Sequence, residues 1–190
     1  KGAFIDVSML DCQIAILENA IARYLSKKEI PEPMGSRHPS IAPFEAFKTK
    51  DSYIIIAAGN DKLFAKLCDV LKISEMANDE RFNTNSLRCE NMDQLKEIFE
   101  KKLNLKSTDE WVKEMEELKI PCGPIFNIKQ AVENPQIKER NMIIKSYHKV
   151  IGEFKSAGNP IKMSTYKDEE TRGDIPDLDE HREKIIKEFV

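Results

Sequence analysis

A cationic pair in a proline-rich segment is the feature of this sequence best suited to chemistry. Arg37 and His38 are adjacent within residues 31–43, a stretch that also holds four prolines and one glycine. Each proline restricts its own backbone and that of the preceding residue, which excludes a helix and predicts a loop. A positively charged loop suits an anionic substrate. An exposed histidine without a role, or a hinge between subdomains, is the alternative interpretation.

Cysteine chemistry has weaker support. Cys122 lies between Pro121 and Gly123 in a tight turn that can expose a thiol. A nucleophilic cysteine needs a base and a lowered pKa, and the sequence identifies no partner for it. We therefore expect the cysteines to be reduced and mostly packed as small apolar groups, as in a cytoplasmic protein: Cys12, Cys68, Cys89 and Cys122.

Histidine and aspartate patterns do not identify a reaction by themselves. The three histidines, His38, His148 and His181, lack the spacing of metal ligands, so we expect no metal site. Asp6 and Asp11 bracket a predicted helix start, and helix capping explains Asp11 without catalysis. The sequence also contains no phosphate-binding loop and no dinucleotide fingerprint.

Composition excludes several classes of protein. The chain has 190 residues, of which 41% are hydrophobic, enough for an ordinary core. Lysine and arginine total 30 against 33 acidic residues, which gives a formal charge of −3. This balance argues against a nucleic-acid partner bound through its phosphates. The apolar runs are far shorter than the roughly 20 residues of a bilayer span, so we expect no membrane insertion.

The elements that must position these residues can be predicted from periodicity. Residues 3–7 predict a strand, and Ser8 with Asp11 signals the start of a five-turn amphipathic helix from Leu10 to Leu25. A strand that leads directly into a long helix is typical of the middle of an α/β unit. A trimmed N-terminus is the alternative explanation.

The remainder of the chain predicts helices grouped around a small sheet, an α+β fold class. Strands are expected at residues 44–48, 53–58 and 161–163, with two more within 143–154; helices are expected from residue 61, at 91–103, from 107, within 131–142 with a break at Asn134-Pro135, and at 178–190. Residues 167–177 are polar and predict a connecting loop.

Six short motifs follow one another along the chain. They are G-A-F-I-D-V-S-M-L-D from residue 2, R-H-P-S-I-A-P-F from 37, G-N-D from 59, D-E-R-F-N-T-N from 79, P-C-G-P-I from 121 and P-D-L-D-E-H from 176. In this order they resemble the family III CoA-transferases, which include formyl-CoA transferase, the carnitine and bile-acid CoA-transferases and α-methylacyl-CoA racemase. Arg88 and Asn91 also follow as in the family, whereas Asp179 replaces its usual glycine.

The resemblance implies a C-terminal fragment without the nucleophile. The family nucleophile is an aspartate that forms a mixed anhydride and then an aspartyl-CoA thioester, and it is expected upstream of Lys1. Neither Asp6 nor Asp11 is therefore assigned as the nucleophile, and the fragment alone should be inactive. Coenzyme A is implied as a substrate, with an acyl-CoA and a carboxylic acid as partners and no permanently bound cofactor.

The resemblance also implies how the chain is divided. Residues 1–30 would end a segment of a Rossmann-like large domain, 31–43 would form a linker and active-site loop, 44–150 the small α+β domain, and 151–190 a return to the large domain. The complete enzyme would be an interlocked homodimer.

Four residues of the loop are the expected substrate-binding residues: His38, Ser40, Ile41 and Ala42. Where formyl-CoA transferase has a mobile glycine-rich loop, Pro39 and Pro43 stiffen this one. Two alternatives remain open at this point, an α-methylacyl-CoA racemase of the same family and a non-catalytic interaction domain with this fold. The loop favours the transferase.

Overall fold

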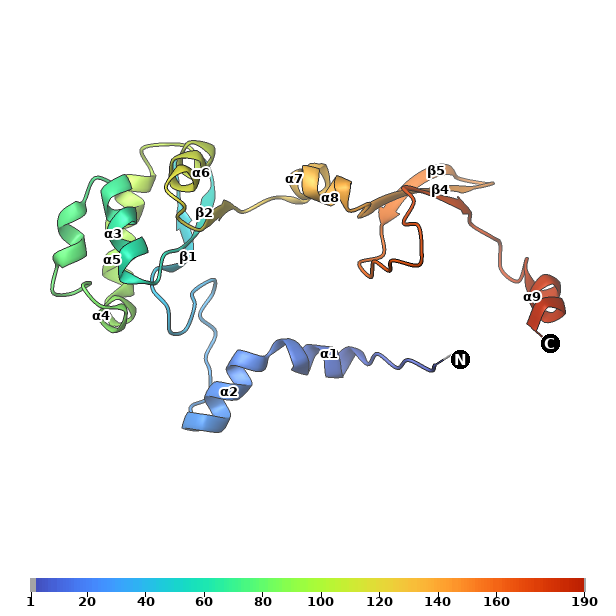
Figure 1. The fold of residues 1–190 in the computed structure, drawn as a ribbon, viewed down its shortest axis with the longest axis horizontal. Helices are drawn as coiled ribbons and strands as arrows, with labels where there is room; N and C mark the ends of the chain where they lie inside the picture. The colour runs from blue at the N-terminus through green and yellow to red at the C-terminus, as the bar shows by residue number, and fades with distance from the viewer. Residues whose placement is uncertain (1–2, 190) are drawn as a thin grey trace. The chain divides into compact units, whose positions relative to one another are not determined.

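The computed structural model describes residues 3–189. It divides the chain into two compact units, Lys1–Pro124 and Ile125–Val190, each of which is described here by itself. Figure 1 gives the order of the elements. Within the described residues, no helix is long and apolar enough to cross a membrane.

The first unit is built on a three-stranded antiparallel sheet in the order β1-β2-β3. Its strands are β1 (Phe44–Lys48), β2 (Tyr53–Ala57) and β3 (Cys122–Pro124). Phe47 pairs with Ile54 across the first two strands, and both side chains are fully buried. This burial follows from the alternation of a strand, in which every second side chain points to the same face. β1 and β2 form where the sequence predicts them.

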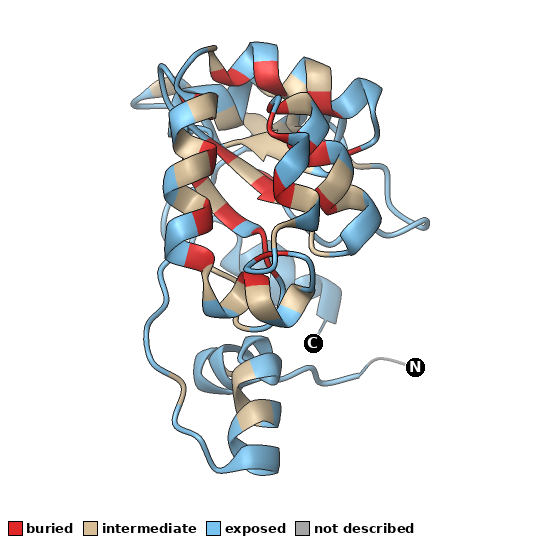
Figure 2. Cartoon of the chain, turned by 90° about the vertical axis from the view of Figure 1, so that its left-hand side faces the viewer, coloured by how far each residue is buried: buried red, intermediate tan, exposed pale blue. Residues whose placement is uncertain are grey.

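Helices cover the buried face of this sheet and supply most of the core (Figure 2). They are α3 (Asp61–Val70), the 3₁₀ helix η1 (Ser74–Asn78), α4 (Asn85–Glu90), α5 (Met92–Leu103) and α6 (Thr108–Glu117). The starts of α3, α4 and α6 are each capped by a side chain, from Asn60, Thr84 and Ser107 respectively. Such caps satisfy backbone N–H groups that have no partner inside the helix. The core is contiguous, with Phe64 and Phe99 stacked near its centre.

The N-terminal part of the first unit differs from the prediction. Residues 3–7 form no strand, since a strand needs a neighbour to bond with and none of the described residues pairs with this segment. The expected five-turn helix is interrupted at Leu17 and forms α1 (Met9–Ile16) and α2 (Glu18–Lys27). The predicted start is confirmed, because the Ser8 hydroxyl accepts the backbone N–H of Asp11. Neither helix contains a buried residue.

The second unit contains a small mixed sheet in the order β5-β4-β6. Its elements are α7 (Ile128–Glu133), α8 (Pro135–Glu139), β4 (Ile143–His148), β5 (Gly152–Ala157), β6 (Thr171–Asp174) and α9 (Arg182–Phe189). The helical break at Asn134-Pro135 and the β4–β5 hairpin are confirmed. The strand expected at 161–163 is wrong, because the Asn159 side chain accepts the N–H of Ile161 and holds a turn there.

A strand beside β4 comes instead from residues 167–177, which were predicted to be a loop. β6 runs parallel to β4, with Lys145 opposite Thr171. The whole chain thus has the predicted α+β class, with helices and small sheets in both units.

Candidate functional site

The proline-rich segment leads into β1 along a path fixed by its main chain. The backbone N–H of His38 donates to the carbonyl of Phe44 at 2.9 Å, which folds residues 38–44 into a closed loop. The N–H of Ala58 donates to the carbonyl of Pro43 at 2.9 Å and joins the loop to the end of β2. We name residues 38–43 the substrate loop, after the role that the sequence predicts for it. Its non-helical, bent course confirms the prediction of a loop for this segment.

Arg37 is turned toward the core and paired with acidic side chains. Its Nε donates to Glu45 at 3.2 Å, and its Nη2 donates to Asp93 at 2.5 Å. The hydrogen bond from Arg37 lowers the pKa of the Asp93 carboxyl, and the same contact raises the pKa of Arg37. Glu45 is buried and also accepts from Lys96. The cationic character expected of the loop is thus largely neutralised by its own neighbours.

The four predicted substrate-binding residues are held in different environments. Ser40 and Ile41 are exposed, His38 is half-buried, and Ala42 is buried with 3% of its surface accessible. The His38 imidazole accepts the backbone N–H of Ser40 through Nδ1 at 3.2 Å. The structure therefore brings all four onto one short loop, with three side chains on its accessible side. Their contact with substrate remains a prediction.

Asn85, the first residue of α4, forms two hydrogen bonds with the middle of the substrate loop. Its Nδ2 donates to the carbonyl of Ser40 at 2.9 Å, and its Oδ1 accepts the N–H of Ala42 at 3.0 Å. An amide side chain can make this paired contact because it carries both a donor and an acceptor.

Arg88, one turn further along α4, holds the end of the loop from inside the core. Its side chain is fully buried, and it donates to the carbonyls of Ala42, Phe82 and Gly59 at 2.8 to 2.9 Å. It also donates to the Asp61 carboxylate at 2.8 Å, and its guanidinium lies 4.5 Å from the centre of the Phe64 ring. A buried charge requires such partners, and arginine provides five donors in a fixed plane. Arg88 thereby joins the loop to the turn before α3 and the turn before α4.

Gly59 leaves room for the side chain of Ile41 to pack against the backbone. A Cβ atom built at Gly59 would lie 2.0 Å from Cγ2 of Ile41, a distance that atoms do not reach without displacement. The absence of a side chain at this position therefore allows the loop to lie against the end of β2.

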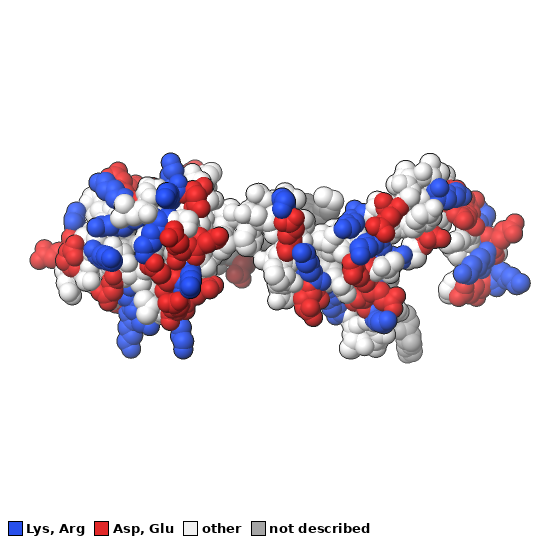
Figure 3. All heavy atoms as spheres, turned by 90° about the horizontal axis from the view of Figure 1, so that it is seen from above, with Lys and Arg blue, Asp and Glu red and all other residues white. Residues whose placement is uncertain are grey.

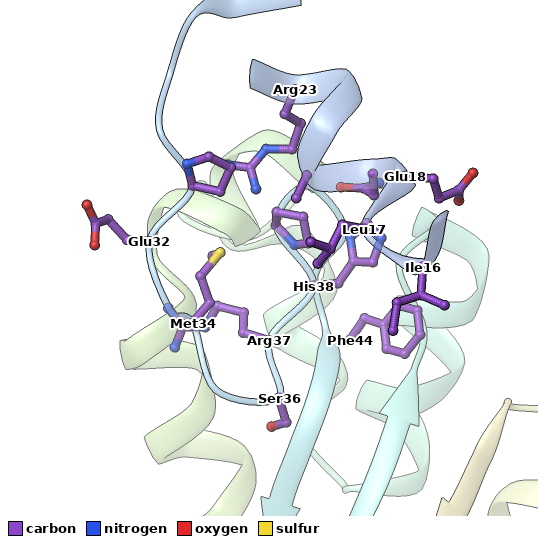
Figure 4. Close-up of a pocket in the computed structure, with 14 residues that line it drawn as sticks. Ile16, Leu17, Glu18, Arg23, Glu32, Met34, Ser36, Arg37, His38 and Phe44 are labelled. Carbon is purple, nitrogen blue, oxygen red and sulfur yellow. The ribbon is translucent and has the colours of Figure 1, made fainter. Parts of the chain in front are cut away.

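Two hollows of several hundred Å³ border the substrate loop. One of about 560 Å³ is lined by Ile16 and Leu17 and by His38 and Phe44, among others (Figure 4). A second of about 410 Å³ lies beneath the loop and is mostly apolar, with two amide side chains in its wall. It is lined by Ile41, Phe44, Ala57, Gly59, Asn60, Leu63 and Asn85. These hollows can take a small organic acid or part of an acyl chain.

The other residues considered for chemistry are not arranged as an active site. Burial raises the pKa of the Cys122 thiol, and its Sγ lies 3.9 Å from the carbonyl oxygen of Val112. Burial also raises the pKa of Cys68 to about 12. Of the four free cysteines, Cys68 is buried, Cys89 and Cys122 are half-buried, and Cys12 is exposed. In the described part of the chain, no three histidine, cysteine or acidic side chains come together as metal ligands.

Asn85, Arg88 and Gly59 were not predicted as site residues. All three belong to, or follow, motifs that carried the family resemblance, which is the only signal that marked them. Asp79 of the same motif accepts from the backbone N–H and the guanidinium of Arg81 at 2.7 to 3.0 Å, which lowers its pKa to about 2. This motif thus builds the turn that presents α4 to the loop.

Comparison with known proteins gives the same family over nearly the whole chain. The family model for CoA-transferase family III matches residues 1–182. The acetyl-CoA:oxalate CoA-transferase of Acetobacter aceti is 40% identical over 190 residues, which are all of this chain and 48% of that protein. The human succinyl-CoA:glutarate CoA-transferase is 34% identical, again over all of this chain and 43% of its own length. The chain therefore spans about half the length of the curated relatives it matches.

A solved structure agrees with the sequence comparison. The crystal structure of a CaiB/BaiF family protein from Brucella suis superposes with a TM-score of 0.75 and 35% identity, covering 99% of this chain and 48% of that one. The shared fold, the ordered motifs and the family match lead to one conclusion: this chain belongs to CoA-transferase family III.

Proposed function

We propose that the protein to which this chain belongs transfers CoA from an acyl-CoA to a carboxylic acid. The observation that carries the proposal is the match to CoA-transferase family III over residues 1–182. Two relatives bear names that couple an acyl-CoA with oxalate or with glutarate. Both of these acids are dicarboxylic acids, and we extend the proposal to a small dicarboxylic acid as acceptor.

The proposed reaction passes through a covalent intermediate on an aspartate N-terminal to Lys1. The aspartate attacks the thioester carbonyl, which forms a mixed anhydride and expels CoA thiolate. The thiolate then attacks the aspartyl carbonyl of the anhydride, which releases the donor acid and leaves an aspartyl-CoA thioester. The acceptor acid repeats these steps in reverse. CoA is a substrate in this scheme, and no permanently bound cofactor takes part.

The substrate loop would cover the reacting carboxylates during these steps. His38, Ser40 and Ile41 have accessible side chains that suit contact with the acid. Ala42 is buried, and its N–H and carbonyl are bonded to Asn85 and Arg88, so it would contribute by shaping the loop. An anhydride is hydrolysed readily, so a closed loop protects the intermediate by excluding water.

The same proposal assigns the remaining segments. Residues 44–150 would form the small domain, while residues 1–30 and 151–190 would pack with the large domain of an interlocked homodimer. The exposed apolar side chains of α1 and α2 support this assignment, since Leu10 and Leu25 are both more than half accessible. The four free cysteines support a cytoplasmic location.

Surface charge is compatible with a small anionic acid and argues against a nucleic-acid partner. In the view of Figure 3, Lys and Arg are interspersed with Asp and Glu on the surface of the first unit, so neither sign dominates that face. Recognition of the acid would then depend on a few placed groups of the loop and not on a broad field.

An acyl-exchange assay of the full-length protein tests this function. The protein is mixed with acetyl-CoA or succinyl-CoA and a panel of mono- and dicarboxylic acids, and new thioesters are identified by mass spectrometry. We expect a new CoA ester with at least one dicarboxylic acid. Deuterium uptake next to the thioester of a 2-methylacyl-CoA without acid exchange would indicate a racemase instead. Neither reaction across the panel would indicate a non-catalytic domain.

A further inference from the structure

The Ser40–Ala42 segment of the substrate loop depends on few supports. The core fixes the end of the loop through Arg88, which donates to the carbonyl of Ala42, and through the hydrogen bond from the N–H of Ala58 to the carbonyl of Pro43. The start is fixed by the backbone bond between His38 and Phe44. Between these two anchors lie Ser40 and Ile41, both exposed.

Asn85 is the side chain that spans this interval. It receives the N–H of Ala42 and donates to the carbonyl of Ser40, so that it holds the peptide groups on both sides of Ile41. It is itself partly exposed and lies in the wall of the 410 Å³ hollow beneath the loop. This amide therefore contributes both to the course of the loop between Ser40 and Ala42 and to the shape of the hollow.

We propose that Asn85 is a positioning residue that sets the substrate loop for binding of the acid substrate, without itself taking part in bond formation. The inference rests on the proposed function, because it assigns the loop to the acid. When the amide is removed, the Ser40 carbonyl and the Ala42 N–H lose their shared partner, and the segment from Ser40 to Ala42 is held less firmly. The loop would then spend much of its time away from the arrangement that receives the acid.

Two substitutions separate positioning from folding. Asn85→Ala removes both hydrogen bonds. Asn85→Asp keeps an acceptor for the Ala42 N–H but places a carboxylate oxygen opposite the Ser40 carbonyl, where it cannot donate. Since Asn85 is the first residue of α4, an aspartate there also suits the helix N-terminus and should preserve folding. Asn83→Ala, an exposed asparagine two residues earlier, is the matched control.

The first measurement is steady-state kinetics of the full-length variants with the acid and the acyl-CoA varied separately. We expect Asn85→Ala and Asn85→Asp to lower kcat/KM for the acid at least tenfold, with the KM for the acyl-CoA changed less than twofold. Asn83→Ala should match the wild type. An equal loss of kcat/KM for the acid and for the acyl-CoA would indicate general damage and overturn the positioning role.

The second measurement does not require activity. Hydrogen exchange followed by mass spectrometry reports the backbone N–H of Ala42, which Asn85 protects. We expect faster exchange in the peptide covering residues 38–44 of Asn85→Ala, with the β1–β2 peptides unchanged. Unchanged exchange in this peptide would contradict the proposed role of the Asn85 hydrogen bonds in holding the loop. An active wild type with unaffected Asn85 variants overturns the positioning role alone, whereas a wild type that transfers CoA to none of the acids overturns the proposed function and this inference together.

Discussion

The imidazole of His38 lies parallel to the ring of Phe44, with 5.3 Å between the ring centroids and 6° between the planes. Its Nδ1 accepts the N–H of Ser40, so in the neutral ring the proton resides on Nε2. The stacking and the hydrogen bond together fix both the plane and the tautomer. Nε2–H is thus a directed donor on the substrate loop, suited to a carboxylate oxygen of the acid.

This arrangement predicts different results for two substitutions of His38. His38→Asn can keep a side-chain acceptor for the Ser40 N–H but lacks the donor at the position of Nε2. His38→Ala loses both. We expect both variants to lower kcat/KM for the acid by roughly tenfold or more, which corresponds to one lost hydrogen bond to a charged group. Hydrogen exchange of the loop should increase only in His38→Ala. Wild-type kinetics in both variants would remove His38 from the site.

The contact between Gly59 and Ile41 predicts a suppressor pair. Gly59→Ala forces the Ile41 side chain or the loop to move and should cost about 1–3 kcal/mol of unfolding free energy, as overpacking does. Adding Ile41→Ala removes the clashing methyl and should recover most of that stability. Thermal denaturation of the single and double variants measures the coupling.

Gly123→Ala serves as the control for this pair, because a Cβ at that position meets nothing within 4 Å. Its melting temperature should stay close to that of the wild type. Additive effects of Gly59→Ala and Ile41→Ala would show that the two positions do not interact.

Arg88 should be among the least replaceable residues of the first unit. Arg88→Met leaves the carbonyls of Ala42, Phe82 and Gly59 without this donor and should cost about 3–5 kcal/mol, the range for breaking a buried ionic network. Arg88→Lys keeps the charge but not the planar set of donors, so an intermediate loss is expected. Chemical denaturation measures both values. Arg81→Met, at an exposed arginine, should show a much smaller loss.

The hydrogen bonds from Arg81 to Asp79 predict a specific dependence of stability on pH. They lower the pKa of Asp79 from 3.8 to about 2, so the folded state favours the ionised carboxylate. The resulting stabilisation is complete above about pH 4 and is lost as the pH falls toward about 2. Asp79→Asn should flatten this part of the profile, and Arg81→Gln should do the same by removing the main cause of the shift. A wild-type slope in both variants between pH 4 and pH 2 would contradict the assignment.

The reactivity of the Cys12 thiol tests whether another part of the full-length protein covers α1. The residue is exposed in this structure, whereas burial raises the pKa of the Cys68, Cys89 and Cys122 thiols. If residues 1–30 pack against a large domain, Cys12 should react with a thiol reagent far more slowly in the full-length protein than in the 190-residue chain. Cys12→Ser should remove the fast phase in the chain. Equal fast rates in both proteins would argue against this packing.

Periodicity predicted the elements whose sequences contain a complete apolar pattern. The stripe of α5 and the β-branched run of β2 specify their structure locally, and Asn60 and Ser107 mark helix starts through capping. By contrast, β3 is only three residues long and contains both a glycine and a proline, so its sequence carries no strand signal. It forms because β2 offers an unpaired edge, which is a tertiary effect.

The candidate site shows the same division between local and tertiary information. The loop could be predicted because prolines exclude other structures. The burial of Arg88 could not, because arginine is normally exposed and its four partners come from three separate segments of the chain. The strand predicted at residues 3–7 fails for a different reason. Its apolar pattern suits a strand, but none of the described residues forms a strand beside it.

Much of the hold on the substrate loop comes through its peptide groups, which bond to Asn85, Arg88 and neighbouring backbone. The side chain of Ser40 takes no part in these bonds, whereas that of Ile41 packs against Gly59. The residue at position 40 can therefore vary without changes to the scaffold, and the residue at 41 can vary together with the one at 59. A single ancestral framework could diversify toward acids of different length by this means, provided that its amide and guanidinium anchors were retained.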